Sequence, residues 1–318
     1  MDGGVGRWVG VDVGGSKVLA GVVTATGEVL RTALRRTPGR LVAAEAVEDA
    51  LVDAVTAVTG DEPLAAVGVA AAGFVDRDGS RVVFAPHLPW RGEDVRDRLA
   101  QRLGAPVLLD NDATCAAYAE ATYGAGRGVS SMLLVALGTG IGGGIVVDGG
   151  LWRGQHGMAG EFGHMQVVPD GAPCECGRRG CWEQYSSGNA LVRVARSRLG
   201  VEPTVLTDLC DGDPDRLTGP MVTEAAESGD LVARAAFASV GRWLGVGLAN
   251  LVAAFDPALL VVGGGVAVAG DRLLAPAREA LEASLVGAGH REVPPLVPAA
   301  LGPSAGLVGA AVLAGATV

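Results

Sequence analysis

The sequence has little lysine, few aromatic residues and no basic run. Of its 25 basic residues, 24 are arginines and one is Lys17, against 35 acidic residues, which gives a net charge of −10. A surface of this sign excludes nucleic acid and anionic membranes as favoured partners. Aromatic residues make up 4% of the chain, whereas 49% is hydrophobic and glycine occurs 50 times. The core must therefore be built from alanine, valine and leucine, with many tight turns.

A long unbroken apolar run is also missing. The most apolar region, residues 244–269, is interrupted by Asp256-Pro257 and by the glycines at 263–265, so we expect no transmembrane span. The glycine-rich N-terminus reaches Asp12 without the pattern of a signal peptide. With 318 residues, the chain can form two domains with substantial cores. Its five cysteines, three of them close together, fit a cytoplasmic protein.

The three neighbouring cysteines indicate a metal site. Cys174, Cys176 and Cys181 follow the spacing C-x-C-x4-C, and His164 lies ten positions before the first of them. Three thiolates and one imidazole form a closed tetrahedral shell, which is typical of structural Zn2+. The alternative is a loop with a few unreactive thiols, which this spacing makes less favoured.

Two carboxylates accompany this loop. Glu161 lies three positions before His164, and Glu183 lies two positions after Cys181. A metal that orders the loop would also fix these acceptors, as a hydroxyl-rich ligand such as a sugar requires. The alternative is that both are surface charges beside a metal.

Three glycine turns follow predicted strands. Residues 7–13 and 18–23 read as strands joined by a turn of Gly14, Gly15, Ser16 and Lys17, and a further strand follows the turn at 27–28. Residues 130–147 repeat this pattern around Gly138, Thr139 and Gly140, and the strand at 259–262 ends in Gly263, Gly264 and Gly265. Exposed N–H groups at such turns can bind phosphate, and Asp12 could hold Mg2+. Ordinary hairpins are the alternative.

A group of two carboxylates and one amide lies at a predicted strand-to-helix junction. The strand 107–109 ends in Asp110-Asn111-Asp112, and a helix is predicted over 113–122. Asn111 or Asp112 could serve only as the helix cap, but three polar residues exceed what a cap requires. The remaining pattern predicts a strand at 64–72, a surface insertion at 200–220, and helices at 41–58, 191–199, 221–255, 272–285 and 306–313.

These motifs together resemble the ROK family of sugar kinases, within the actin-like ATPase superfamily. The resemblance covers most of the chain and rests on DVGGSK (12–17), DNDATCAA (110–117), LGTGIGGGIV (137–146), GMAGEFGHM (157–165), CECGRRGCWE (174–183) and VVGGG (261–265). It implies an α/β, actin-like ATPase (ribonuclease H-like) fold with two similar α/β domains and a central cleft. We expect one domain over residues 1–110 plus about 300–318, and the other, with the zinc loop, over 111–299.

The resemblance also implies residue roles. Asp112 resembles the catalytic base that takes the proton from the sugar hydroxyl as it attacks the γ-phosphate of ATP. The sugar-binding residues would be Gly73, Asn111, Asp112, Glu161, His164 and Glu183. The nucleotide and its Mg2+ would be held by Asp12, Gly14, Gly15, Ser16, Lys17, Gly138, Thr139, Gly140, Gly263, Gly264 and Gly265. Structural Zn2+ would be held by His164, Cys174, Cys176 and Cys181.

The expected function is the ATP-dependent phosphorylation of glucose to glucose 6-phosphate by a cytoplasmic homodimer or homotetramer. Kinases for mannose, fructose or an N-acetylhexosamine such as N-acetylmannosamine share the scaffold, and polyphosphate could replace ATP. A glycoside hydrolase would use Asp112, Glu161 and Glu183 as paired carboxylates but leaves the glycine turns unexplained. A sugar-sensing repressor would need a helix-turn-helix ahead of Asp12, and only eleven residues precede it.

Overall fold

The computed structural model describes residues 8–60 and 62–317. Its strands are β1 (Trp8–Val13), β2 (Lys17–Val23), β3 (Val29–Arg36), β4 (Val67–Ala71), β5 (Phe74–Val75), β6 (Val82–Phe84), β7 (Val107–Asn111), β8 (Ser131–Leu137), β9 (Ile141–Val147), β10 (Gly150–Leu151), β11 (Leu259–Gly263) and β12 (Leu296–Pro298). Its α-helices are α1 (Ala44–Thr59), α2 (Val95–Leu103), α3 (Asp112–Tyr123), α4 (Gly188–Arg196), α5 (Leu206–Leu209), α6 (Gly219–Glu227), α7 (Leu231–Phe255), α8 (Asp271–Ser284) and α9 (Ala305–Gly315). Short 3-10 helices lie at η1 (Phe162–His164), η2 (Trp182–Gln184), η3 (Pro214–Arg216), η4 (Gly265–Ala269) and η5 (Gly302–Ser304).

Internal contacts divide the chain into two compact units. The first comprises residues 1–134, 143–160 and 299–318, and the second comprises 135–142 and 161–298. The C-terminal segment thus returns to the first unit, and the boundary falls within β8 and β9. This division assigns 111–134 and 143–160 to the first unit, whereas the sequence led us to place the boundary at residue 110; the domain limits drawn from the sequence stay a prediction.

The first unit is built on a five-stranded sheet in the order β3-β2-β1-β4-β7. Strands β1, β2 and β3 are antiparallel neighbours, and β4 and β7 continue the sheet in parallel with β1. Alternate residues of a strand face opposite sides. Val9, Val11 and Val13 therefore join one core with side chains of α1 and α2.

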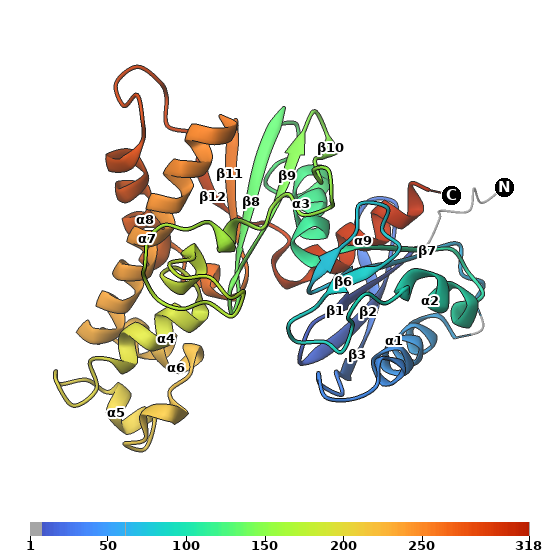
Figure 1. The fold of residues 1–318 in the computed structure, drawn as a ribbon, viewed down its shortest axis with the longest axis horizontal. Coiled ribbons are helices and arrows are strands. Elements are labelled where there is room, and N and C mark those ends of the chain that lie inside the picture. The colour runs from blue at the N-terminus through green and yellow to red at the C-terminus, as the bar shows by residue number, and fades with distance from the viewer. Residues whose placement is uncertain (1–7, 61, 318) are drawn as a thin grey trace. The chain divides into compact units, whose positions relative to one another are not determined.

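The opposite face of this sheet is covered closely by α9, the red helix in Figure 1. A Cβ atom at Gly10 would overlap the backbone carbonyl of Leu307, and one at Gly68 would overlap that of Ala310. Glycine is therefore required at both positions because helix and strands approach to backbone contact. On its other side, α9 packs against α3 with similar closeness at Gly309 and Cys115.

The second sheet repeats the connection pattern of the first. Its order is β10-β9-β8-β11-β12, so in both sheets the first three strands form a meander and the next strand lies on the far side of the first. The β9–β10 pair is antiparallel and the β11–β12 pair is parallel, as in the corresponding pairs of the first sheet. The prediction of two similar α/β halves is confirmed by this repeated order.

The long apolar helix α7 belongs to the core of the second unit. Its 25 residues have the length and hydropathy to cross a membrane, but 61% of the most apolar window is buried inside the protein. It packs alongside α8 (Figure 1), with close approaches at Gly241 and Gly245. Burial of this kind explains its composition without a bilayer.

One element prediction was wrong in this unit. The predicted helix 221–255 is divided into α6 and α7 because Gly229 adopts a positive φ of 96° and Asp230 begins a new helix by accepting a hydrogen bond from Ala233 N. The predicted surface insertion at 200–220 does lie between helices α4 and α6 and is mostly exposed. It contains α5 and η3, and the buried side chains of Leu206 and Leu217 attach it to the core.

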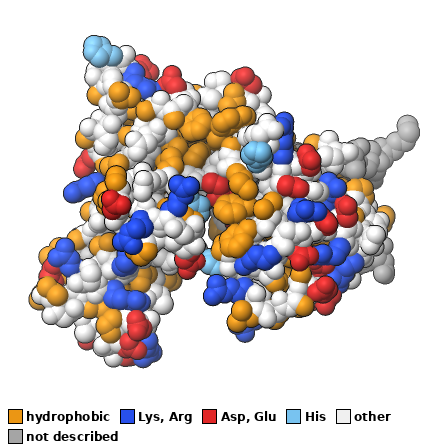
Figure 2. All heavy atoms as spheres, viewed as in Figure 1, with side chains coloured by type: hydrophobic (Ala, Val, Ile, Leu, Met, Phe, Trp, Pro, Cys, Tyr) orange, Lys and Arg blue, Asp and Glu red, His pale blue; other side chains and the backbone are white. Residues whose placement is uncertain are grey.

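The surface carries charges of both signs. Figure 2 shows acidic and basic side chains interspersed over the visible face. Many are paired across the surface, as in Arg31–Glu62 at 3.0 Å and Arg81–Asp94 at 2.8 Å. Arginine thus balances neighbouring carboxylates at many surface positions.

Candidate active site

The first set of candidate residues lies where the parallel strands of the first sheet end. Asp12 is paired in register with Ala70 of β4, and Ala70 is paired with Asp110 of β7. Residues paired across parallel strands project from the same face, so Asp12 and Asp110 lie on one side of the sheet. Gly306, at the start of α9, is the small residue that faces this acidic group, since a Cβ there would lie 3.7 Å from the Asp12 carboxyl carbon.

Asp112 is held by its own helix terminus. It is the first residue of α3, and its Oδ1 accepts hydrogen bonds from Ala113 N at 2.9 Å and from Asn111 Nδ2 at 3.0 Å. Asn111 is the cap of α3, since its Oδ1 accepts from Thr114 N at 2.9 Å. The capping prediction is confirmed, but the cap uses only the Asn111 oxygen. Both hydrogen bonds that Asp112 accepts from these two neighbours go to Oδ1.

Asn111 also connects Asp112 to the predicted pocket residue Gly73. Its Nδ2 donates to the carbonyl oxygen of Gly73 at 3.1 Å. A Cβ atom at Gly73 would meet the backbone of Phe84 and Ala85 at 2.7–2.9 Å, so this position accepts only glycine. The structure therefore brings Gly73, Asn111 and Asp112 together, as we predicted for one wall of a sugar site.

The electrostatics of this group favour a base that functions near neutral pH. Burial, reinforced by the nearby charge of Asp12, raises the pKa of Asp112 to about 6. Burial also raises the pKa of Asp12, and the ammonium of Lys17 opposes that rise. A carboxylate with a pKa close to the working pH is well suited to accept a proton in a transition state.

The first glycine turn joins β1 to β2 as predicted. Gly14 N donates to Lys17 O at 2.9 Å, which closes the turn, and Gly15, Ser16 and Lys17 are exposed at its tip. Thr37, which the sequence did not single out, buttresses the turn by donating its hydroxyl to Gly14 O at 2.6 Å. The exposed tip leaves N–H groups, a hydroxyl and an ammonium free to receive an anion.

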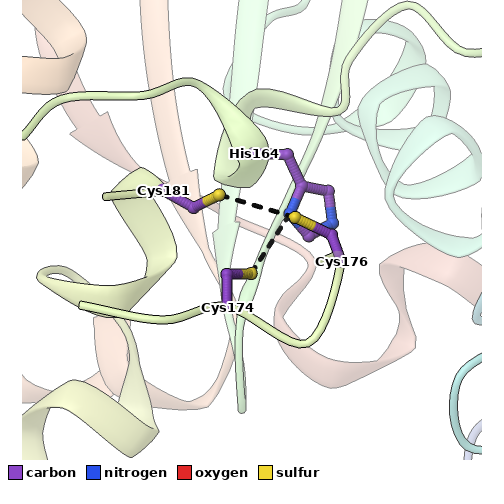
Figure 3. A group of neighbouring side chains, drawn as sticks. All are labelled: His164, Cys174, Cys176 and Cys181. Carbon is purple, nitrogen blue, oxygen red and sulfur yellow. Dashed lines mark hydrogen bonds between the residues drawn. The ribbon is translucent and has the colours of Figure 1, made fainter. Parts of the chain in front are cut away.

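In the second unit, the predicted metal ligands converge. One ligand atom from each of His164, Cys174, Cys176 and Cys181 lies within 4.8 Å of the others, and Figure 3 shows the three sulfur atoms gathered about one imidazole. Cys176 and Cys181 Sγ are 3.6 Å apart, and Cys174 Sγ is 3.8 Å from His164 Nδ1. Tetrahedral coordination at Zn–S bonds of 2.3 Å requires sulfur atoms about 3.8 Å apart, so the donor set fits Zn2+.

The charges of the cluster also fit a cation. Burial raises the pKa of the Cys174 and Cys181 thiols. The pKa of the Cys176 thiol is lowered. Burial raises it, but hydrogen bonds from Arg178 N and from the neighbouring thiols outweigh the effect of burial. The three thiols therefore cannot all ionise without a compensating positive charge, and a divalent metal supplies it.

Glu183 joins this cluster to the second glycine turn. Its Oε1 accepts a hydrogen bond from the Cys174 thiol at 3.1 Å and lies 3.6 Å from His164 Nδ1. Its Oε2 occupies the space that a side chain on Gly140 would need. The neighbouring Trp182 is fully buried and donates from Nε1 to Trp243 O at 2.7 Å, which anchors the loop on α7.

Glu161 and His164 come from the short helix η1. Glu161 is the residue at its start and His164 is its last residue. A Cβ atom at Gly163, between them, would overlap Ile141 O of β9, so η1 lies directly against the strand that follows the second turn. The second unit thus brings Glu161, His164 and Glu183 onto the metal-binding loop.

The second and third glycine turns also meet in this unit. Gly188 N, at the start of α4, donates to Gly138 O at 2.8 Å, and Asn189 N lies 3.4 Å from Thr139 O. Gly264 adopts a positive φ of 84° and fits against the backbone of Leu137. Glycine is required there by both the conformation and the contact. The turn 138–140 and the turn 263–265 are therefore parts of one surface.

A cavity adjoins that surface. Its volume is about 480 Å3, within the range of small-molecule sites, and its lining comprises Asn189, Val192, Arg193, Arg196, Leu217, Thr218 and Gly219. Nε of Arg196 is buried without a hydrogen-bond partner among the described residues. The sequence did not reveal this cavity because its walls come from α4 and from the start of α6, about 25 residues apart along the chain.

Comparison with known proteins identifies the family of the chain. A family model described as ROK family matches residues 8–317. The glucokinase of Streptomyces coelicolor is 44% identical over 313 residues, which cover 98% of both chains. The crystal structure of a ROK family glucokinase from Streptomyces griseus, in complex with glucose and AMPPNP, is 45% identical, with a TM-score of 0.91 over 98% of this chain and 100% of that chain.

Regulators also occur among the relatives. A xylose repressor of Caldicellulosiruptor bescii is 32% identical over 217 residues, which cover 68% of this chain and 54% of that protein. The glucokinases therefore match along both full lengths, whereas this repressor matches over about half of its own. Membership of a kinase and repressor family displaces the glycoside hydrolase alternative. Because the family model matches nearly the whole chain and these relatives exceed 30% identity, the chain belongs to the ROK family.

Proposed function

We propose that this protein is a glucokinase, which transfers the γ-phosphoryl group of ATP to glucose and forms glucose 6-phosphate. The observation that carries the proposal is Asp112, a carboxylate fixed at a helix start with its pKa raised to about 6. The full-length similarity to glucokinases, one of them in complex with glucose and AMPPNP, supports both substrates.

Asp112 acts as the general base in this proposal. Its oxygen accepts the proton of the glucose hydroxyl while that hydroxyl attacks the γ-phosphorus, and the leaving group is ADP. Phosphoryl transfer depends mainly on positioning and charge stabilisation, so a base that is already oriented suffices. Asn111 provides that orientation through its hydrogen bond to Asp112 Oδ1 at 3.0 Å.

Glu161, His164 and Glu183 bind the other hydroxyl groups of glucose. Carboxylates accept hydrogen bonds from sugar hydroxyls, and an imidazole N–H donates to a hydroxyl oxygen, provided that these groups are held at fixed separations. Zn2+ held by His164, Cys174, Cys176 and Cys181 would supply this rigidity, because it would crosslink the loop that carries all three residues. The nitrogen of His164 that faces the cysteines is Nδ1, 3.8 Å from Cys174 Sγ, and this nitrogen would be the one that binds the metal.

The two glycine hairpins bind the phosphates of ATP. Gly14 N and Gly138 N close the two turns by donating to Lys17 O and Gly140 O, so the phosphate donors are backbone N–H groups at the tips, from Gly15, Ser16 and Thr139. The ammonium of Lys17 offsets negative charge, and Asp12 would hold Mg2+, which would supply further positive charge beside the phosphates. The adenosine end extends past Gly263 to Gly265 towards the cavity beside α4, which Asn189 links to the second hairpin.

We place the enzyme in the cytoplasm, where reduced thiols are maintained. All five cysteines are free, and three of them form the metal cluster. A homodimer or homotetramer stays a proposal, for which the molar mass in solution is the direct measurement.

The test is a substrate panel with purified protein. Glucose, mannose, fructose and N-acetylmannosamine are each offered with MgATP and with magnesium polyphosphate, and the phosphorylated product is identified by mass and NMR. We expect glucose with ATP to give the highest kcat/KM and glucose 6-phosphate as product. A higher value for another sugar would transfer the proposal to that sugar.

The repressor-like alternative is a sugar-binding protein without catalysis. Its expected signature is glucose binding by calorimetry with no ADP release. Measuring both quantities on the same preparation separates a regulator from a kinase.

A further inference from the structure

Arg153 makes a buried ion pair next to the catalytic strand end. It lies in the segment between β10 and Glu161, and its Nε and Nη2 both contact Asp110 Oδ2, at 2.8 and 2.7 Å. The Asp110 side chain is only 9% exposed and that of Arg153 is 30% exposed. A carboxylate this buried depends on its partner, because loss of one member leaves an uncompensated charge.

The other carboxylate oxygen of Asp110 forms a hydrogen bond to the backbone of Asn111, the residue next to Asp112. Asp110 Oδ1 accepts a hydrogen bond from Asn111 N at 2.9 Å. Asn111 in turn donates from Nδ2 to Asp112 Oδ1 at 3.0 Å and to Gly73 O at 3.1 Å. A continuous series of polar contacts therefore runs from Arg153 through Asp110 and Asn111 to Asp112, and all of its members lie in the first unit.

The segment that carries Arg153 is itself well anchored in this unit. Trp152 N donates to Ile145 O at 2.9 Å, and Ala159 N donates to Arg153 O at 3.1 Å. Gly157, with a positive φ of 79°, fits against the backbone of Val75 to Arg77. Because its backbone is fixed on both sides, Arg153 presents its guanidinium to Asp110 with little conformational freedom left to lose.

We propose that Arg153 is a positioning residue for phosphoryl transfer, which holds Asp110 so that Asn111 orients the carboxylate of Asp112. This inference rests on the proposed role of Asp112 as base. Without Arg153, the Asp110 carboxylate must move towards water or take up a proton, and either change disturbs the hydrogen bond to Asn111 N. A small displacement of Asp112 is enough to lower the rate, since a general base must lie within hydrogen-bonding reach of the hydroxyl whose proton it takes.

The chain offers a matched control in the pair between Arg98 of α2 and Glu48 of α1. Glu48 is 1% exposed, Arg98 is 34% exposed, and Nη2 lies 2.6 Å from Oε1. This pair is of the same type and in the same unit. Its other ion-pair partners within the described residues are Glu93 and Arg102, and neither is a predicted site residue. Its removal should therefore affect stability alone.

The experiment compares Arg153→Met, Arg153→Lys and Arg98→Met by thermal unfolding and by steady-state kinetics. We expect both methionine variants to lower Tm. Only Arg153→Met should lower kcat, by about 10- to 100-fold, the usual effect of losing such a supporting contact, with KM for ATP unchanged. Arg153→Lys should recover part of kcat, because an ammonium can still pair with Asp110, though without the forked geometry.

A second measurement tests the route through Asp110. Asp110→Asn removes the charge that Arg153 balances, so the double variant Asp110→Asn/Arg153→Met should have a kcat no lower than the worse single variant. Multiplicative losses would show that Arg153 acts independently of Asp110 and would overturn the inference. If Arg153→Met does not fold, Arg153→Lys is compared with the wild type and with Arg98→Met instead. The expected result for Arg153→Lys is then a reduced kcat at a nearly normal Tm.

The inference fails separately from the proposed function. Wild-type kcat in Arg153→Met, with Tm lowered as in Arg98→Met, would make the pair structural only, and Asp112→Asn would still be inactive. High activity in Asp112→Asn would instead overturn the assignment of the base, and with it the role of Arg153.

Discussion

The two units present their polar residues in different ways. In the first, Asp12 is the second-to-last residue of β1 and Asn111 is the last residue of the parallel strand β7, so sheet hydrogen bonds fix their positions. Asp112 begins the helix α3 that follows β7. In the second, Glu161 and Glu183 lie on a loop with only the 3-10 helices η1 and η2 as regular structure. The first group is held by the backbone, whereas the second depends on side-chain ligands.

This difference suggests a division of work. A buried carboxylate at a strand end is desolvated and has a raised pKa, which suits proton transfer. Acceptors on a loop that a metal would fix gain rigidity from a ligand, which suits recognition of hydroxyl groups. Removing one residue from the first unit should therefore lower kcat, and removing a metal ligand from the second should raise KM for the sugar.

The largest effect is expected for Asp112→Asn. Loss of the general base should lower kcat by about 10²- to 10⁴-fold while glucose affinity changes little. The amide keeps an oxygen that can accept from Ala113 N, so the start of α3 should be preserved. Single-turnover kinetics and glucose binding by calorimetry measure the two quantities, with Asp53→Asn, an exposed carboxylate of α1, as control. A kcat near the wild-type value would assign the base elsewhere.

Loss of the metal should come next. Cys176→Ala removes one ligand, and we expect loss of bound zinc and an increase in KM for glucose of about 10-fold or more, with a smaller effect on KM for ATP. Cys210→Ala is the matched control, because this buried cysteine lies outside the cluster and donates to Thr207 O. Metal content by mass spectrometry and glucose KM in the same sample decide the result. A zinc-free variant with normal KM would contradict the organising role.

The pH dependence should report on the first unit. Protonated Asp112 cannot accept a proton, so kcat/KM for glucose should fall about tenfold per pH unit below its pKa of about 6. Stability should change in the opposite direction. Folding raises the pKa of Asp112 from 3.8 to about 6, so the folded state favours the protonated carboxyl group. The stabilisation that this group contributes is therefore fully present below pH 3.8 and is lost as the pH rises through about 6. Urea unfolding of wild type and Asp112→Asn across this range measures the difference.

The smallest effect is expected where the second hairpin meets Glu183. The added methyl group of Gly140→Ala would overlap Glu183 Oε2, so the carboxylate must move, and we expect KM for glucose to rise about three- to tenfold, below the effect of removing a ligand. Gly150→Ala is the control, since this glycine lies outside the proposed site and a methyl group there would be at an ordinary contact distance of 3.5 Å from Val147 O. Equal kinetics in the two variants would show that Glu183 adapts freely and would weaken the contrast between the units.

Much of this could be predicted from local patterns. The metal ligands lie within a short stretch, and their chemistry is specific, so the spacing of Cys174, Cys176 and Cys181 predicted the cluster that the structure contains. The strand–glycine–strand pattern predicted both hairpins, because alternating apolar residues and a glycine turn are local signals. The division at Gly229 was missed because the apolar periodicity of α6 and α7 continues almost without interruption across it.

Other features depend on segments that are distant in the sequence. Arg153 and Asp110 are 43 residues apart, and no spacing rule relates them. The cavity beside α4 has walls from two helices that only packing brings together. The sequence by itself determined the ligand set, the acidic strand end and the glycine turns, because each is encoded by neighbouring residues. Only the tertiary structure decided how far Asp112 is desolvated and which charge supports its neighbour, because burial and ion pairing arise when distant segments pack.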